Sequence, residues 1–430
     1  MHVVGSVVAG GVDPRPFAAA IIAVGSELLT PEKVDTNSLF ITQTLNDLGI
    51  AVAFKSIVGD DRAELTAHVA HALQRHRVLI LTGGLGPTDD DLTREVVAAH
   101  LGLAMHEDPE IITVMERRFA SRGWTMPAVN RRQAQVPEGA TVLANPNGTA
   151  PGLWLTHDGA VIALLPGPPR EMKPMMAGEV RSRLLALAGD TRLHRRLVRV
   201  SGKGESAVEE IVQPIYSRWL AQDPRIETTI LAGLGQVELH LVLQSTDAAR
   251  AALVLAVAVA ELTAALGQDV VSTDGRGLEA VVGDLLRARG WWVALAESCT
   301  GGLATSRLTD VPGSSDYVER SVVAYSNQAK VELLGVPAAL IQDHGAVSEA
   351  VAVAMAEGIR DRAGVNVGVG ITGIAGPGGG SDDKPVGTVC IAVAGALTEV
   401  RTFRFPGGRE MVKAMSANWA IDLLRRQLLT

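Results

Sequence analysis

The chain has 430 residues, with 39 Lys and Arg against 47 Asp and Glu, which gives a formal net charge of −8. Its 47% hydrophobic and 20% charged residues are typical of a globular protein and exclude extensive disorder. The acidic balance argues against a general nucleic-acid binder, and two cysteines, Cys299 and Cys390, exclude a disulfide scaffold and a four-cysteine zinc site.

The first block, residues 18–170, alternates strand and helix patterns. Runs rich in apolar residues predict strands at 18–24, 52–58, 77–81 and 161–165. Amphipathic patterns predict helices between them, at 36–48 and 63–75. Short strands that alternate with helices pair in parallel through right-handed crossovers, so this block is predicted to be an α/β domain.

Glycines and acidic side chains follow the strands of this block. The run from Thr82 to Asp91 has three glycines, whose N–H groups can hold a phosphate, and then three carboxylates that can hold a magnesium ion. Gly25, Glu27 and Asn37 lie after the first strand, on the same predicted sheet edge. These features predict a nucleotide-like ligand with a metal ion. The alternative is an acidic helical turn favoured by the helix dipole.

Residues 171–268 are predicted to form a small α+β domain. Residues 192–199 are strongly basic, and 237–243 alternate mostly with period two, as a half-exposed strand does. The turn Gly202–Gly204 begins a helix. It either holds a phosphate or serves only as the start of that helix.

We expect no part of the chain to cross a membrane. The longest apolar run, 251–260, is closed by Arg250 and Glu261 and is too short for a bilayer span, so it predicts a packed helix. The first ten residues lack the basic region of a signal peptide. We therefore expect a cytoplasmic protein without a membrane partner.

The third block, residues 273–430, returns to an α/β pattern. Helices are predicted at 278–289 and 303–308, and strands at 292–296, 365–371 and 386–393. The Gly-rich loop that follows Ile371 is not a P-loop, because no Gly-Lys-Ser/Thr follows it, so ATP hydrolysis is not predicted. Arg401, Arg404 and Arg409 are candidates for clamping a phosphate.

Ser298 stands where a predicted buried strand gives way to a helix. Ligands of open α/β sheets bind at this strand end. The free N–H groups of the new helix can stabilise an oxyanion or bind a phosphate. A serine hydroxyl becomes a nucleophile only when a base takes its proton. Lys330, five positions after Tyr325, is the predicted base, as in Ser–Lys variants of the catalytic triad.

Three alternatives stay open at this site. Cys299 is an intrinsically better nucleophile, and a helix N-terminus lowers a thiol pKa, but no histidine lies near it in the sequence, so Ser298 is preferred. A distant base such as His344 is possible. The remaining alternative is that Ser298 merely caps the helix and Lys330 is a solvated helix residue.

Four motifs of the third block resemble the nicotinamide-nucleotide amidohydrolase domain of the CinA (competence/damage-inducible protein A) family. They are the runs Ala296–Gly302, Ala324–Lys330, His344–Ser348 and Thr372–Pro377. The front block, through Gly25–Leu29 and Thr82–Thr88, resembles that family's molybdopterin-binding-like domain, and the middle block resembles its KH-type domain. The implied fold is a three-layer α/β front domain, an α+β KH-like middle domain and an α/β rear domain.

For the rear domain, the resemblance implies hydrolysis of nicotinamide mononucleotide to nicotinic acid mononucleotide and ammonia, without a cofactor. It carries the nucleophile role onto Ser298 and supporting roles onto Tyr325 and Lys330. The predicted substrate contacts are Cys299, Thr300, Gly301, Gly302, Thr372, Gly373 and Arg409.

For the front domain, the resemblance implies pyrophosphatase action on ADP-ribose or related dinucleotides, with a divalent metal such as magnesium or cobalt at Asp90 and Asp91. The predicted nucleotide contacts are Gly25, Glu27, Asn37, Gly83, Gly84, Gly86, Thr88, Pro166 and Gly167. The alternative is a molybdopterin- or nucleotide-binding module that acts in competence or the DNA-damage response without turnover.

The partners that we expect are pyridine nucleotides, as substrates, and a second copy of the chain in a homodimer. The KH-like block lacks an obvious Gly-X-X-Gly clamp with flanking basic residues, so a nucleic-acid partner is not expected and a dimer-forming or spacing role is preferred.

Overall fold

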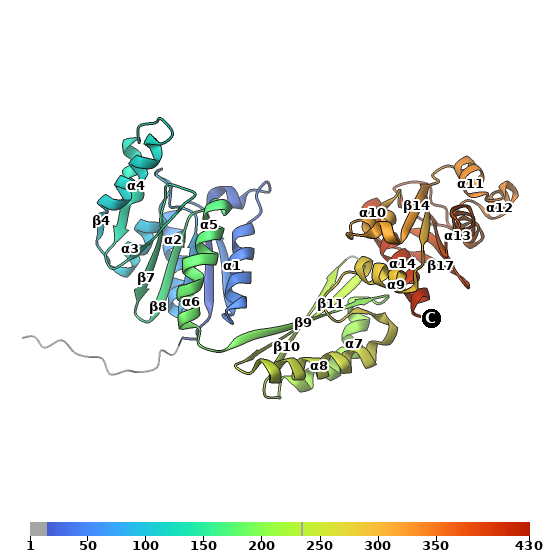
Figure 1. Cartoon of the computed structure of the whole chain (residues 1–430), viewed down its shortest axis with the longest axis horizontal. Helices are drawn as coiled ribbons and strands as arrows, with labels where there is room; N and C mark the ends of the chain where they lie inside the picture. The colour runs from blue at the N-terminus through green and yellow to red at the C-terminus, as the bar shows by residue number, and fades with distance from the viewer. Residues whose placement is uncertain (1–14, 234) are drawn as a thin grey trace, which may run out of the picture. The chain divides into compact units, whose positions relative to one another are not determined.

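The computed structural model describes residues 15–233 and 235–430. The chain divides into two compact units. The first unit consists of the residues up to Leu193 together with the short segment Gln244–Ala248. It contains the front α/β domain. The second contains the small middle domain and the rear α/β domain (Figure 1).

The front domain is built on a six-stranded sheet with the order β2-β1-β3-β8-β7-β6. Its strands are β1 (Ala19–Val24), β2 (Val52–Val58), β3 (Val78–Thr82), β6 (Thr141–Leu143), β7 (Gly152–His157) and β8 (Ala160–Leu165). All the predicted strands are present, and β2, β1, β3 and β8 pair in parallel. β7 runs antiparallel to β8 because a short turn joins the two strands, and β6 pairs antiparallel with β7.

Helices cover both faces of this sheet (Figure 1). Alternate side chains of β1 face opposite ways, so Ile21 packs with α1, α5 and α6, whereas Ile22 packs with α2, α3 and α4. Met172 and Leu184 lie in the first of these cores, so the front domain continues beyond residue 170, where the sequence predicted its end. The helices are α1 (Thr36–Asp47), α2 (Arg62–Arg75), α3 (Thr93–Leu101), α4 (Pro109–Ala120), α5 (Pro169–Met175), η3 (Met176–Val180) and α6 (Arg181–Leu187). The short elements are η1 (Ser26–Leu29), β4 (Met105–Glu107), η2 (Ala128–Ala134) and β5 (Gln135–Pro137).

The middle domain is a four-stranded sheet, β10-β11-β9-β12, with helices α7 and α8 packed against it. Its elements are β9 (Arg192–Ser201), α7 (Glu205–Trp219), β10 (Ile226–Gly233), β11 (Gln236–Ser245), α8 (Ala248–Leu266), η4 (Gly267–Asp269) and β12 (Val270–Ser272). The turn Gly202–Gly204 precedes α7, and the Lys203 ammonium forms an ion pair with Asp269 (3.4 Å). The positive charge of the turn that was considered for a phosphate is therefore paired within the protein.

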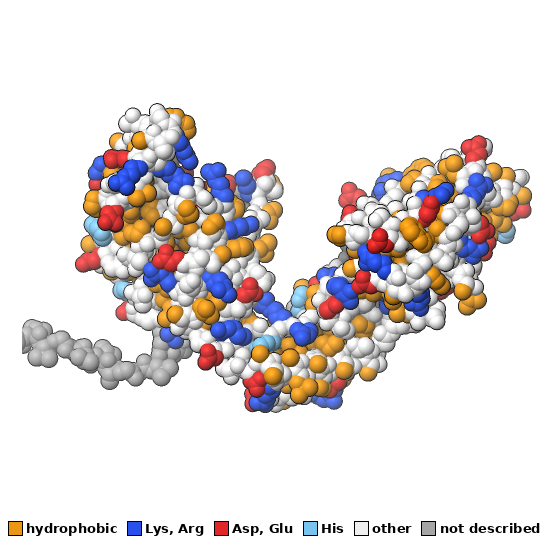
Figure 2. Space-filling model, viewed as in Figure 1, with side chains coloured by type: hydrophobic (Ala, Val, Ile, Leu, Met, Phe, Trp, Pro, Cys, Tyr) orange, Lys and Arg blue, Asp and Glu red, His pale blue; other side chains and the backbone are white. Residues whose placement is uncertain are grey.

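Helix α8 contains the apolar run predicted as a packed helix, and it is longer than predicted. By length and composition it would suit a membrane span, but Leu255 and Leu262 on one side are buried in the core of the middle domain. Leu253 and Val257 on its other side are exposed, and hydrophobic side chains are visible over this part of the surface (Figure 2). The prediction that this apolar run forms a helix packed in a folded domain is therefore confirmed for the side that contains Leu255 and Leu262.

The rear domain is a five-stranded sheet with the order β14-β13-β15-β16-β17. Its strands are β13 (Val293–Glu297), β14 (Val318–Val323), β15 (Val367–Gly373), β16 (Thr388–Ala394) and β17 (Thr398–Arg404). β14, β13 and β15 pair in parallel, but β16 and β17 are antiparallel, a feature that the α/β pattern does not predict. The residues between β16 and β17 are too few for a crossover helix, so these two strands form a hairpin.

Two helical layers enclose this sheet. α9 (Leu278–Arg289), α10 (Leu303–Thr309) and α14 (Arg409–Leu429) pack on one face. α11 (Asn327–Leu334), α12 (Ala338–His344) and α13 (Glu349–Ala363) pack on the other, and η5 (Ser314–Asp316) precedes β14. Glycines bring α13 close to the sheet, since a Cβ on Gly370 would lie 2.3 Å from the carbonyl oxygen of Ala352.

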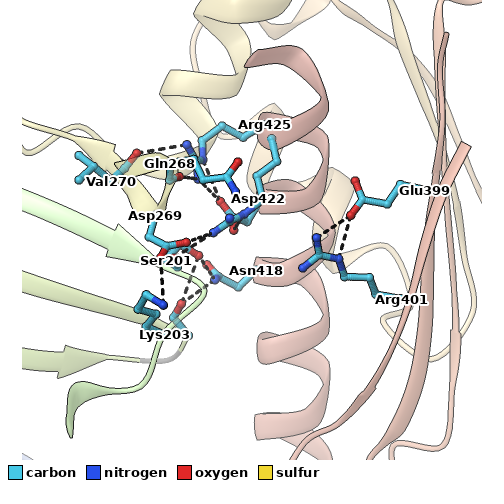
Figure 3. A network of polar contacts seen from close by, with 12 residues as sticks. Ser201, Lys203, Gln268, Asp269, Val270, Glu399, Arg401, Asn418, Asp422 and Arg425 are labelled. Carbon is cyan, nitrogen blue, oxygen red and sulfur yellow. Dashed lines mark hydrogen bonds and ion pairs between the residues drawn. The ribbon is translucent and has the colours of Figure 1, made fainter. Parts of the chain in front are cut away.

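The middle and rear domains meet through a polar network on α14 (Figure 3). Buried Asp422 pairs with Arg425 and Arg426, at 2.8 Å each. Arg426 also reaches Asp269 of the middle domain (2.7 Å). Asn418 donates a hydrogen bond to the carbonyl oxygen of Gly235 in the β10–β11 turn (2.9 Å). These contacts explain why the two domains form one compact unit.

We expect the Asp422→Asn variant to lower the free energy of unfolding of the second unit by about 3 kcal/mol, because buried Arg425 and partly buried Arg426 lose a counter-charge. Urea unfolding followed by circular dichroism measures the change. Glu399→Gln, which breaks the partly exposed Glu399–Arg401 pair on β17 (2.7 Å; Figure 3), is the control. We expect it to cost less than about 0.5 kcal/mol. Equal effects of the two variants would contradict this account.

Candidate active site

Ser298 directly follows β13 and is almost fully buried, with 7% of its surface exposed. Its N–H donates to the carbonyl oxygen of Ile371 (2.9 Å), which fixes the residue to the end of the neighbouring strand β15. Gly301 and Gly302 have φ angles of 64° and 94°, where a side chain would be strained, so glycine is needed for this turn.

The turn after Ser298 is closed by the carboxylate of Glu297. It accepts hydrogen bonds from the N–H groups of Gly302 (2.9 Å), Ala304 (3.2 Å) and Thr305 (2.8 Å). The expectation that the N–H groups of this short helix are free to bind an anion is therefore wrong for these three, because Glu297 already satisfies them. The side chain that accepts from the first N–H groups of α10 is thus that of Glu297 and not that of Ser298.

Lys330 of α11 reaches the same point from the other side of the sheet end, with 2% of its surface exposed. Its Nζ lies 3.2 Å from Ser298 Oγ and donates to the carbonyl oxygens of Ala324 (3.0 Å) and Tyr325 (3.4 Å). All three described partners are uncharged. Burial lowers the pKa of Lys330 below its ordinary value of 10.5, because the ammonium form loses hydration, while the neighbouring Cys299 opposes the shift.

Cys299 lies beside this pair and is also buried, with 5% of its surface exposed. Burial, with a smaller contribution from the nearby Glu297 charge, raises the pKa of its thiol to about 12. At neutral pH the side chain is therefore a thiol and not a thiolate. Of the two nucleophiles considered from the sequence, the geometry favours Ser298.

Tyr325 and Arg409 form a pair that is separate from the buried Ser298–Lys330 contact. The Tyr325 side chain is 60% exposed, and its hydroxyl accepts a hydrogen bond from Arg409 Nη2 (3.0 Å). Arg409 also donates to the carbonyl oxygen of Gly376 (2.9 Å). The described contacts link Tyr325 to Lys330 only through its backbone carbonyl. The Tyr325 side chain therefore lies at the rim of the site, and any supporting role that it has is exerted from there.

Thr372 and Gly373 lie beside Ser298 because β13 and β15 pair in parallel. The Thr372 hydroxyl donates to the carbonyl oxygen of Ala346 (2.7 Å). Gly373 has no space for a side chain, since a Cβ would lie 2.7 Å from the side chain of Val389. Both predicted contacts are therefore close to the serine, but the Thr372 hydroxyl already has a partner.

Two other residues singled out in the sequence, Thr300 and His344, form no described hydrogen bond with Ser298 or Lys330. Thr300 is fully buried, and its hydroxyl has no hydrogen-bond partner among the described residues. His344 ends α12, and its carbonyl oxygen accepts from Lys384 Nζ (2.8 Å). In the described part of the chain no hydrogen bond connects His344 with Ser298, so the lysine is the nearer base.

The front domain has two adjoining cavities at the carboxyl ends of its parallel strands, of about 360 Å³ and 380 Å³. Most predicted ligand residues line one or both of them: Gly25, Glu27, Asn37, Gly83, Gly84, Gly86, Asp90, Asp91, Pro166 and Gly167. Asn37 joins two of the loops, donating to Thr82 Oγ1 (3.1 Å) and to the carbonyl oxygen of Gly167 (2.7 Å). The structure therefore gathers these residues, as their positions after strands predicted.

Asp91 and Thr88 are used to hold the glycine loop together. Asp91 Oδ1 accepts from the N–H of Gly86 (2.7 Å), and Oδ2 accepts from the N–H (2.9 Å) and hydroxyl (2.6 Å) of Thr88. Buried Arg94 donates to the carbonyl oxygens of Leu85 and Gly86 (2.7 and 3.0 Å). Thr88 is not among the residues that line the two cavities. The hydrogen bonds of the Asp91 carboxylate hold the loop between Gly86 and Thr88 in place.

Asp90 is the predicted metal residue that stays exposed at the cavity. The nearby Thr88 side chain and the local backbone hold the pKa of its carboxyl below the ordinary value, so it is charged at neutral pH. In the described part of the chain no three His, Cys, Asp or Glu side chains are grouped to hold a metal ion. A divalent cation fits here only if a ligand's phosphates complete its coordination, as is common for magnesium.

The sequence missed four polar residues of the first cavity, which are Asp60, Gln133, Thr149 and Glu171. Asp60 follows β2, and its carboxylate accepts from the N–H of Ser26 (2.9 Å), so its position after a strand was a usable signal. Glu171 closely follows the Pro166–Pro169 run, which ends a predicted strand. Gln133 lies in η2, just before β5, and it follows no strand that the sequence predicted, so it offered no such signal.

A glycine-lined acidic cavity in one α/β domain and a buried serine–lysine pair in another define a multidomain α/β protein with two separate candidate sites. Residues 20–186 match the family described as probable molybdopterin binding domain, and residues 276–428 match the CinA C-terminal domain. A CinA-like protein of Koribacter versatilis is 47% identical over 416 residues, covering 96% of this chain and 100% of the relative. The chain belongs to the CinA family.

A second relative and a solved structure are also similar to this chain. A CinA-like protein of Synechocystis is 42% identical over 418 residues, covering 96% of this chain and 99% of the relative. The crystal structure of the competence/damage inducible protein CihA from Agrobacterium tumefaciens is 38% identical, covers 36% of this chain and 94% of its own, and has a TM-score of 0.35. The predicted family and the predicted α/β fold class are confirmed.

Proposed function

We propose that the rear domain is an amidohydrolase that converts nicotinamide mononucleotide to nicotinic acid mononucleotide and ammonia. The observation that carries the proposal is the 3.2 Å separation of Lys330 Nζ and Ser298 Oγ in a buried setting. The choice of substrate rests on the resemblance of the surrounding motifs to the amidohydrolase domain of the CinA family.

A neutral amine at Lys330 can satisfy all three of its polar contacts, with the Ser298 hydroxyl as donor. A neutral amine has two N–H donors and one lone pair, and the carbonyl oxygens of Ala324 and Tyr325 are placed to accept the two donors. The lone pair is then left to accept the hydroxyl proton of Ser298. Because burial lowers the pKa of Lys330, this neutral form is more populated near neutral pH than for an exposed lysine.

The reaction follows from this arrangement. Ser298 Oγ attacks the carboxamide carbon while its proton moves to Lys330 Nζ, and the resulting ammonium gives that proton to the amide nitrogen as the C–N bond breaks. Ammonia leaves, and the acyl group stays on Ser298 as an ester. Water then attacks the ester, with Lys330 again taking and returning a proton, and releases the carboxylic acid and free Ser298.

The direct test is to incubate the protein with nicotinamide mononucleotide and to measure ammonia together with the mass of the product. We expect one ammonia for each carboxylate formed. Free nicotinamide and nicotinamide riboside are the controls that show how much the phosphate and ribose contribute to turnover. No ammonia from any of the three compounds would overturn the proposal.

For the front domain we propose pyrophosphatase action on ADP-ribose or a related dinucleotide. The supporting observation is the mixture of Gly83, Gly84 and Gly86 with five acidic side chains around one cavity, with no Lys or Arg among the described residues that line it. Such a wall repels a bare phosphate, so a divalent cation would have to accompany it, with Asp90 as its protein contact. When bound, the cation would supply charge stabilisation at the phosphates.

Calorimetry tests this second proposal without relying on turnover. We expect ADP-ribose to bind at least about tenfold more tightly with Mg²⁺ than without it, and Asp90→Asn to remove most of that difference, since it removes the exposed carboxylate. Ammonia release by the rear domain should be unchanged. Binding without release of AMP would favour the alternative of a ligand-binding module, and equal binding with and without Mg²⁺ would exclude the metal.

A further inference from the structure

Glu297 is a fully buried carboxylate next to Ser298, and the proposed reaction does not use it. Its two oxygens accept four hydrogen bonds: three from backbone N–H groups of residues 302, 304 and 305, and one from the hydroxyl of Thr305 (2.6 Å). The donors are all neutral N–H or O–H groups, and three of them belong to the start of a helix, where a negative charge is favoured.

The backbone of the same residue is bonded to the segment that leads to Lys330. The carbonyl oxygen of Glu297 accepts from the N–H of Ala324 (2.9 Å), and the carbonyl oxygen of Ala324 accepts from Lys330 Nζ (3.0 Å). The carboxylate of Glu297 meanwhile fixes the far end of the turn that contains Ser298. Glu297 therefore connects the two segments whose side chains meet at 3.2 Å.

The groups around the Glu297 side chain favour a carboxylate, because they offer hydrogen-bond donors to both of its oxygens. All four described contacts are donors that point at the Glu297 oxygens. A glutamine of the same shape would turn its NH₂ group toward one pair of donors, and each such pair includes at least one backbone N–H group that would lose its acceptor. Since buried donors must be satisfied, the turn would shift to find other acceptors.

We propose that Glu297 is a positioning residue: by holding the turn between Ser298 and α10, its carboxylate sets the direction of the Ser298 hydroxyl relative to Lys330. This inference rests on the proposed amidohydrolase function. It assigns no contact between Glu297 and the substrate. A displacement of about 1 Å in a reacting group is enough to slow catalysis about 100-fold, so the effect belongs in kcat and not in KM.

The test compares kcat and KM for ammonia release in a set of variants. We expect Glu297→Gln to lower kcat about 100-fold with KM changed less than about threefold. Thr305→Ser keeps the hydroxyl donor and should retain the wild-type kcat, whereas Thr305→Val should lower it to an intermediate value. This graded series stays informative if Glu297→Gln does not fold.

Asp422→Asn is the matched control, because it also neutralises a buried carboxylate of the rear domain, on α14 and away from Ser298. It should lower the melting temperature as much as Glu297→Gln does while leaving kcat within about twofold of wild type. A wild-type kcat in Glu297→Gln and Thr305→Val, or an equal loss in Asp422→Asn, would overturn the inference while leaving the proposed function intact. Absence of ammonia release by the wild-type protein would instead overturn both.

Discussion

Ser298→Ala is expected to abolish ammonia release from nicotinamide mononucleotide, with a fall in kcat of about 10⁴- to 10⁶-fold, because no other described group is placed to form the acyl intermediate with Lys330. The variant should fold normally, since the Ser298 N–H keeps its bond to Ile371 and the turn keeps its bonds to Glu297. A coupled assay for ammonia, run over hours at high protein concentration, measures the residual rate.

Cys299→Ala is the matched control, because it changes the neighbouring buried residue and removes the only other candidate nucleophile of the motif. Most activity should remain, since a thiol whose pKa is raised to about 12 contributes almost no thiolate at neutral pH. If the cysteine variant is inactive and the serine variant is active, then the nucleophile has been assigned to the wrong residue.

Strand and helix patterns predicted the framework of both α/β domains because buried parallel strands are short and continuously apolar. The apolar run that forms β13 gave the position of Ser298, and the strand that ends at Thr82 placed the glycine loop of the front cavity. The run 386–393 predicted strand β16, but its antiparallel pairing with β17 was not predicted, since that pairing depends on a short connection and not on composition.

The site was harder to predict because it depends on contacts between distant segments. The sequence placed Lys330 five positions after Tyr325, but only the fold shows that the lysine points at Ser298 and that the tyrosine hydroxyl points to Arg409. Glu297 was visible in the motif, yet its spacing does not reveal that its side chain turns back to occupy the N–H groups of α10. Those N–H groups had looked available for an anion.

The pH dependence of the reaction is the second prediction with a large effect. Activity requires neutral Lys330, so kcat/KM should rise with pH through the pKa of this lysine and level off above it. Because burial lowers that pKa, the rise should be centred below the ordinary value of 10.5. Lys330→Met keeps the length and apolar stem of the side chain but has no base, and should lower kcat about 10⁴-fold at every pH.

The same shift has a consequence for stability, with a definite sign. Between the lowered folded-state pKa of Lys330 and 10.5, the unfolded chain binds a proton that the folded protein does not. The free energy of unfolding should therefore rise with pH across that window, and this rise should be missing in Lys330→Met. Urea unfolding of both proteins at a series of pH values measures the difference. Parallel stability curves for the two proteins, or ammonia release by the methionine variant, would show that Lys330 is not the buried base on which the proposed reaction depends.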